Sequence, residues 1–171
     1  MIIGLFAAVL QVQSWQPLGL AFLLGSFMMA TLSDLRRLSA QREFVEVWWL
    51  FALIVLILDI LSTKTGSSET GLLALKWGLI AVLSIASWSK VGWLFRLAPG
   101  DVAALAAAAS LLPWWGVPAY YGVARVVSWW LAPLLRRGRM FYPFMPVVSL
   151  ATIVVLGAVL LLEQTGVVAQ P

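Results

Sequence analysis

Two aspartates, Asp34 and Asp101, are the residues of this sequence best placed to do chemistry, because each borders a long apolar run. Asp34 ends the first run in SDLRR, and Asp101 begins the fourth run in APGDVAAL. Two carboxylates held a few ångströms apart share one proton, so the ionised one can take a proton from water while the other donates to a developing oxyanion. The pair therefore predicts hydrolysis of a peptide bond by an aspartyl protease mechanism.

Each aspartate also has a structural interpretation, which the sequence leaves open. Asp is a favoured helix N-cap, and the helix dipole stabilises an anion there by about 0.3–1 kcal/mol, so Asp101 could serve only as a cap. Asp34 stands at the end of an apolar helix, where the dipole disfavours negative charge, and Arg36 and Arg37 could neutralise it. Gly100 precedes Asp101 and, because it has no Cβ, would let a substrate backbone approach the acid closely.

The composition excludes most other kinds of active site and indicates an integral membrane protein. Of the 171 residues, 63% are hydrophobic, and the mean hydropathy of +1.00 is far above that of soluble domains. Cys and His are absent, which excludes disulfides, thiolate nucleophiles, the usual zinc sites and a Ser-His relay. We therefore expect no metal and no cofactor. The basic residues behind the net charge of +4 lie between apolar runs, so the expected partner is an anionic lipid bilayer and not a nucleic acid.

Six apolar runs are candidates for transmembrane helices, since about 20 apolar residues cross a bilayer core and about 17 suffice where the bilayer is thin. We place them at about 17–33, 44–62, 71–95, 101–115, 118–135 and 145–162. The predicted fold is all-α, a polytopic membrane protein with six transmembrane helices. Residues 17–165 form a single domain, 1–16 an interfacial or re-entrant segment, and 166–171 a tail.

The distribution of Lys and Arg predicts how these helices are oriented. Arginines follow the first, third and fifth runs, at positions Arg36, Arg37, Arg42, Arg96, Arg136, Arg137 and Arg139. Because cytoplasmic loops are enriched in basic residues, these connections are predicted to face the cytoplasm, with both termini outside the cell membrane. The two aspartates then lie on the cytoplasmic side. Tryptophans such as Trp48, Trp49 and Trp93 fall near predicted helix ends, where amphipathic rings prefer to lie.

Three segments resemble the archaeal type IV prepilin and preflagellin peptidases, membrane aspartyl proteases of the GxGD class that are distantly similar to presenilin. SDLRR with the following REFVEVWW, from Ser33 to Trp49, is similar to the family's first motif, in which an Asp at the end of a span precedes Arg and a charged loop. APGDVAALAAAASLLPWW, from Ala98 to Trp115, resembles the motif with the second Asp. FYPFMPVVSLA, from Phe141 to Ala151, resembles the start of the last helix. The sequence departs from the family pattern at Ala98, where the first Gly of GxGD stands, and at Ala103, where a Lys is frequent.

The resemblance implies an endopeptidase that cleaves the short basic leader from prepilin-like precursors at the cytoplasmic membrane face, with the two aspartates as the catalytic pair. Bacterial relatives also methylate the new N-terminus through a cytoplasmic domain, often with cysteine-bound zinc, and we expect no methyltransferase activity here. Arg36 belongs to the first motif, and Glu43 and Glu46 could attract a basic leader. The alternative for the two glutamates is ordinary surface charge paired with Arg42.

Two charged residues inside the predicted helices need partners. Arg125 lies about 10 Å from the outer end of the fifth predicted helix, at 1.5 Å per residue, and Asp59 lies near the outer end of the second. We predict a structural ion pair between them. Two other functions stay open: a small proton-coupled transporter or channel that relays protons through Asp101, Arg125 and Asp59, and a non-catalytic membrane assembly factor. A transporter would place acids near the bilayer midplane and show two repeated halves, and the sequence shows neither feature.

Overall fold

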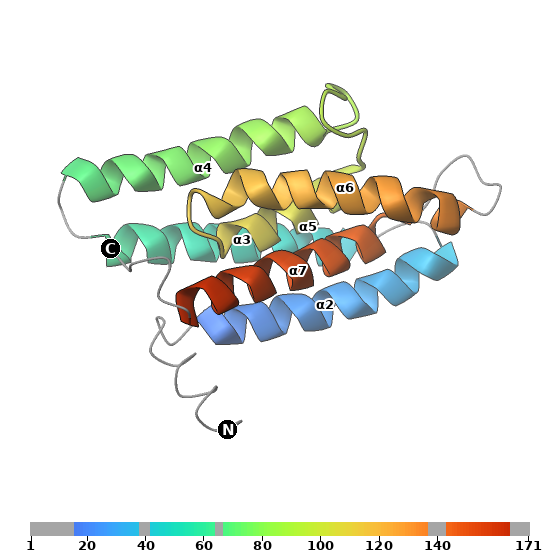
Figure 1. Cartoon of the computed structure of the whole chain (residues 1–171), viewed down its shortest axis with the longest axis horizontal. Helices are drawn as coiled ribbons and strands as arrows, with labels where there is room; N and C mark the ends of the chain where they lie inside the picture. Colours follow the sequence, from blue (N-terminus) through green and yellow to red (C-terminus); the bar gives the residue numbers. More distant parts are fainter. Residues whose placement is uncertain (1–15, 38–41, 64–66, 137–142, 165–171) are drawn as a thin grey trace.

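The structure, a computed structural model, describes residues 16–37, 42–63, 67–136 and 143–164, and these contain six α-helices (Figure 1). The helices are α2 (Gln16–Arg37), α3 (Arg42–Ser62), α4 (Ser67–Ser87), α5 (Pro99–Ser110), α6 (Gly116–Arg136) and α7 (Met145–Gln164). The prediction of an all-α protein with six helices is confirmed. The predicted segment 1–16 lies outside the described residues except for Gln16, which begins α2, and the predicted tail 166–171 lies outside them entirely.

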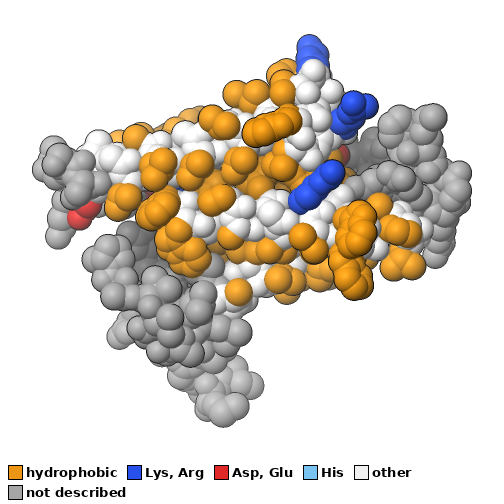
Figure 2. Space-filling model, turned by 45° about the horizontal axis from the view of Figure 1, so that its top comes forward, with side chains coloured by type: hydrophobic (Ala, Val, Ile, Leu, Met, Phe, Trp, Pro, Cys, Tyr) orange, Lys and Arg blue, Asp and Glu red, His pale blue; other side chains and the backbone are white. Residues whose placement is uncertain are grey.

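Two of the helices are long and apolar enough to cross a membrane. These are α3, over Arg42–Ser62, and α4, over Glu69–Ser87. The stretches Leu18–Ser33 and Met145–Ala158 are apolar over shorter lengths. Large apolar side chains are exposed along all of these segments, for example Ile54 of α3 and Val82 of α4. In the space-filling view, hydrophobic side chains are spread over the visible face of the bundle, and Lys and Arg side chains lie near one end of it (Figure 2).

The helices alternate in direction, so α2, α4 and α6 finish at the end of the bundle where α3, α5 and α7 begin (Figure 1). We refer to this end as the Asp101 end, because Asp101 lies in the first turn of α5. The alternation follows from the short connections between helices, since a few residues of loop can only join antiparallel neighbours.

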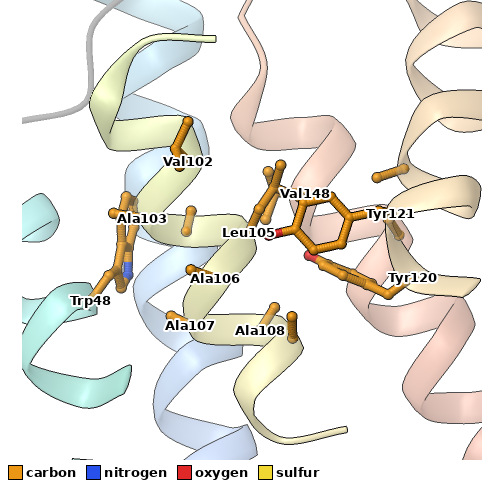
Figure 3. Packing of buried hydrophobic residues seen from close by; sticks show 14 of the residues in the cluster. Trp48, Val102, Ala103, Leu105, Ala106, Ala107, Ala108, Tyr120, Tyr121 and Val148 are labelled. Atoms are coloured by element: carbon orange, nitrogen blue, oxygen red, sulfur yellow. The ribbon is translucent and has the colours of Figure 1, made fainter. Parts of the chain in front are cut away.

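Helix α5 is the centre of the bundle and contacts each of the other five helices. It has 12 residues, so it is about 18 Å long, and residues 102–110 are all buried. Most of them are alanines, whose small side chains let neighbouring helices approach closely. Trp48 of α3 packs against one side of α5, and Tyr120 and Tyr121 of α6 lie on the other side with Val148 of α7 (Figure 3).

The segment after α4 differs from the prediction. A helix was expected over 71–95, but α4 ends at Ser87 and the chain then folds back on itself. The amide of Leu94 donates to the carbonyl of Ala86 at 2.9 Å, and a bridge joins Trp88 to Leu97. Gly92 has φ +63°, a left-handed conformation that favours glycine and does not continue a right-handed helix. Because residues 88–97 include several apolar side chains, the hydropathy pattern predicted that the helix continues through them. In the structure these residues form the loop after α4.

Hydrogen bonds between side chains join neighbouring helices inside the bundle. They are Trp48 Nε1 to Ser26 Oγ at 3.0 Å, Ser84 Oγ with Tyr121 OH at 2.9 Å, Tyr120 OH with Thr152 Oγ1 at 3.1 Å, and Thr31 Oγ1 with Ser149 Oγ at 3.1 Å. No buried side-chain nitrogen or oxygen of the described residues lacks a partner.

Trp48, expected at a membrane interface, is instead completely buried, while its neighbour Trp49 is 47% exposed.

Candidate functional site

Asp101 is the third residue of α5, after Pro99 and Gly100. The N-cap is Ala98, which has an extended backbone and makes no side-chain cap hydrogen bond. The interpretation of Asp101 as the N-cap is therefore wrong, although a carboxylate in the first turn is still favoured by the helix dipole. Asp101 is half-buried and Gly100 is buried, so the acid lies where the central helix meets the surface of the bundle.

Asp34 lies in the last turn of α2, which ends at Arg37. Helix α2 runs toward the end of the bundle from which α5 starts, so the backbones of Asp34 and Asp101 both lie toward the Asp101 end (Figure 1). The side chains of Asp34 and Arg36 lie outside the described residues. The predicted carboxylate pair, and the predicted supporting role of Arg36, stay predictions.

The amino-terminal turns of α3 contribute the other acidic residues of this end. Glu43 and Glu46 are exposed, and Glu46 Oε1 accepts a hydrogen bond from Arg42 Nε at 2.8 Å. The pair with Arg42 is the ordinary surface charge that formed the alternative interpretation of Glu46. Helix α3 packs alongside α5, and Trp48 lies beside Ala103 only two residues after Asp101 (Figure 3). These contacts place the acidic turns of α3 at the same end of the bundle as the start of α5.

The predicted ion pair between Asp59 and Arg125 is wrong. Asp59 Oδ2 accepts hydrogen bonds from Lys76 Nζ at 2.7 Å and from Trp77 Nε1 at 3.0 Å, both on α4. Only 16% of the Asp59 side chain and 13% of the Lys76 side chain are exposed. The guanidinium carbon of Arg125 lies 5.4 Å from the centre of the Phe95 ring instead. A transporter relay from Asp59 through Arg125 therefore lacks the contact between these two residues.

The physical reason is the connectivity of the helices. Only a short loop separates α3 from α4, so the last turns of α3 face the first half of α4, and Lys76 reaches the carboxylate directly. Lys76 was visible in the sequence, just inside the third run and on the same side as Asp59. The guanidinium of Arg125 lies over the Phe95 ring because the loop after α4 folds back, and the hydropathy pattern did not reveal this fold.

Within the described ranges, no group of three or more His, Cys, Asp or Glu residues could hold a metal ion. Comparison of the chain with protein-family models, with curated proteins and with solved structures finds no match. The resemblance to the archaeal prepilin peptidases stays a prediction from the sequence motifs.

Proposed function

We propose that this protein is a multi-pass aspartyl endopeptidase of the cell membrane, with Asp34 and Asp101 as its catalytic pair. The observation that carries the proposal is the alternation of the helices. Asp34 belongs to the last turn of α2 and Asp101 to the first turn of α5, and α2 runs toward the end of the bundle from which α5 starts. The backbones of two acids 67 positions apart in the chain therefore lie toward the same end of one bundle, which supports a mechanism in which they share a proton.

In this proposal all six helices cross the bilayer, and both termini lie outside the cell. The exposed apolar side chains on α3 and α4 support burial of those helices in lipid. Arg37 ends α2, Arg42 begins α3, Arg96 lies between α4 and α5, and Arg136 ends α6, so these arginines belong to the Asp101 end. That excess of basic charge supports a cytoplasmic location for the catalytic pair.

In the proposed reaction the two acids share one proton. The ionised acid takes a proton from the attacking water, and the protonated acid donates a hydrogen bond to the carbonyl oxygen as it becomes an oxyanion. The proton later passes to the leaving amine, and the peptide bond breaks.

The substrate class in this proposal is a prepilin-like membrane protein with a short basic leader before its hydrophobic helix. Glu43 is exposed at the Asp101 end and offers negative charge to such a leader, together with Glu46 and its partner Arg42. The buried Gly100, one residue before Asp101, leaves room for the substrate backbone beside the acid. No cofactor is needed for this hydrolysis.

The test is cleavage of a prepilin-like substrate by the full-length protein reconstituted in liposomes. Asp34→Asn and Asp101→Asn should each reduce the rate about 10²–10⁴-fold or more, because each removes one of the two proton-transfer groups. Glu69→Gln is the matched control, since Glu69 is exposed in the first turn of α4 at the opposite end of the bundle. The variants should keep the melting temperature of the wild type. Full activity in either Asn variant, with the fold intact, would refute the catalytic pair.

A further inference from the structure

The loop after α4 and the α6 residue that packs on it carry three exposed cations. They are Lys90, Arg96 and Arg125, and we refer to them as the basic patch. The Arg96 side chain runs alongside Gly92 in the same loop, at 3.2–3.3 Å from the position that a Cβ would take there. The guanidinium of Arg125 lies over Phe95, the neighbour of Arg96 in the chain, so α6 contributes its cation to the surface of this loop. In the space-filling view, Lys and Arg side chains are found toward one end of the visible face (Figure 2).

Among the described residues, no acidic side chain forms a salt bridge with the basic patch. In the part of the chain that the structure describes, none of the three cations forms an ion pair, whereas Arg42 and Lys76 each pair with a carboxylate. The contacts of the patch are with aromatic rings: Lys90 Nζ lies 5.2 Å from the Trp88 ring centre, and Arg125 lies over Phe95. An aromatic face attracts a cation but leaves its N–H donors available for an anion.

The guanidinium of Arg125 rests on the ring of a buried residue, Phe95. Phe95 is only 4% exposed, and its ring packs edge-on against Phe144 with 5.6 Å between the ring centres. The planar guanidinium therefore rests on a fixed surface. Its donors are suited to a phosphate group, which an arginine can bind through two parallel hydrogen bonds.

The basic patch lies at the level where a membrane-crossing helix ends. The backbone of Leu94 is hydrogen-bonded to Ala86, so Phe95 and the guanidinium above it stand beside the last turn of α4. Trp93 is 83% exposed in the same loop, and Trp129 is 76% exposed one turn beyond Arg125. Exposed tryptophans are typical of the interface between lipid tails and water. Phosphate groups of phospholipids occupy that layer.

We propose that the basic patch binds the phosphate of an anionic phospholipid headgroup in the leaflet at the Asp101 end. Arg125 holds the phosphate, Arg96 and Lys90 add charge, and the exposed Trp93 and Trp129 lie in the surrounding interface. This site rests on the membrane placement of α4 and not on the catalytic pair. Arg125 is the tenth of the 21 residues of α6, so the site places the middle of that helix, and not its end, at the headgroup level. It fixes the depth of the bundle in the bilayer, because the lipid headgroup marks the level of the basic patch.

The experiment measures the binding of short-chain phosphatidylglycerol to the purified full-length protein in phosphatidylcholine micelles, by native mass spectrometry and by the shift in melting temperature. Short-chain phosphatidylcholine and inorganic phosphate are the comparison ligands. We expect the preference for phosphatidylglycerol over phosphatidylcholine to fall about fivefold for each cation replaced by Gln. Arg125→Lys should keep part of the preference, because the charge remains but the planar fork is lost.

Arg42→Gln is the matched control, because Arg42 is exposed at the same end of the bundle but pairs with Glu46. It should leave the preference unchanged. The proposal is overturned if the variant K90Q/R96Q/R125Q, folded by its melting temperature, keeps the wild-type preference. It is also overturned if the wild type binds both lipids equally, or binds inorganic phosphate as well as it binds phosphatidylglycerol. The same measurement in Asp101→Asn, which should bind lipid normally, separates failure of this site from failure of the catalytic pair.

Discussion

Helices α3 and α5 are both apolar, but they make opposite use of their side chains. Helix α5 is built mainly from alanine and is buried throughout residues 102–110. Helix α3 is rich in Leu and Ile and exposes most of them, for example Leu53, Ile57 and Ile60. In soluble proteins the large aliphatic residues are the ones most often buried. Here the small residues form the interior and the large ones cover the surface, as helix association in a bilayer favours, because lipid accepts Leu while close packing needs Ala.

Trp48 and Trp49 are adjacent in α3, but one is buried and the other is exposed. Of the matched pairs of variants, their alanine variants should differ most in the free energy of unfolding. Trp48 is completely buried against Phe27 and Phe44, whereas Trp49 is 47% exposed. Trp48→Ala should lower the free energy of unfolding by about 3–5 kcal/mol, because it leaves a cavity and removes the partner of Ser26. Trp49→Ala should cost less than about 1 kcal/mol. Denaturant titration in detergent micelles measures both.

Trp48→Phe separates the two parts of this effect. It keeps an aromatic ring beside Phe27 but loses the indole N–H that donates to Ser26, so its cost should lie between those of the two alanine variants. Equal losses for Trp48→Ala and Trp49→Ala would show that burial in the bundle does not distinguish the two positions.

The two ion pairs also differ in burial: Asp59–Lys76 is largely buried and Arg42–Glu46 is exposed. Lys76→Met leaves the half-buried Asp59 carboxylate without its cation and should cost about 3 kcal/mol. Arg42→Gln breaks the exposed pair with Glu46 and should change the free energy of unfolding by less than about 0.5 kcal/mol. The double variant Asp59→Leu/Lys76→Met should recover most of the loss, because no unpaired charge remains. A double variant as unstable as Lys76→Met alone would argue against unpaired charge as the cause.

Extra volume should be tolerated on the surface and not in α5. Ala106→Leu should destabilise the protein by about 1–3 kcal/mol, since Ala106 is 1% exposed at the centre of the bundle. Ala74→Leu makes the same change at an exposed position of α4 and should be within about 0.5 kcal/mol of the wild type. Melting temperatures of the two variants in the same detergent provide the comparison. If Ala106→Leu melts with the wild type, α5 is not close-packed.

The smallest effects are expected at two glycines of α2. A Cβ at Gly25 would meet nothing within 4 Å, so Gly25→Ala should stabilise the helix by about 0.5–1 kcal/mol. A Cβ at Gly19 would lie 3.2 Å from Phe51 Cζ, and the ring must move aside. Gly19→Ala should therefore gain less than Gly25→Ala or nothing at all. Denaturant titration of both variants checks the order, and a larger gain at Gly19 would contradict the close approach of α2 and α3.

Much of the fold could be predicted from the sequence. The expected runs 44–62, 118–135 and 145–162 match α3, α6 and α7 to within a few residues, because an apolar run bounded by polar residues or proline is a local signal. The expected run 71–95 extended eight residues too far, since the loop after α4 also carries apolar residues and buries Phe95 and Leu97. Hydropathy cannot distinguish a helix from a loop that contains several apolar side chains.

The sequence likewise predicted some features of the candidate site and not others. A short, alanine-rich helix was predicted at 101–115, and the structure has it at Pro99–Ser110, so Asp101 is its third residue and not its first. The partners of Asp59 and Arg125 could not be predicted from the sequence. The position of a charge along a predicted helix does not specify which neighbouring helix or loop faces it. Lys76 and Phe95 hold these positions through contacts between helices and through the folded-back loop.

By itself the sequence determined the all-helical class and, for the described residues, the number and approximate positions of the helices. These properties depend on local patterns. Only the tertiary structure decided that α5 is the centre, that Trp48 is buried while Trp49 is exposed, and that Arg125 lies over Phe95. Those outcomes depend on which helix faces meet, and that choice is made by the packing of all six helices together.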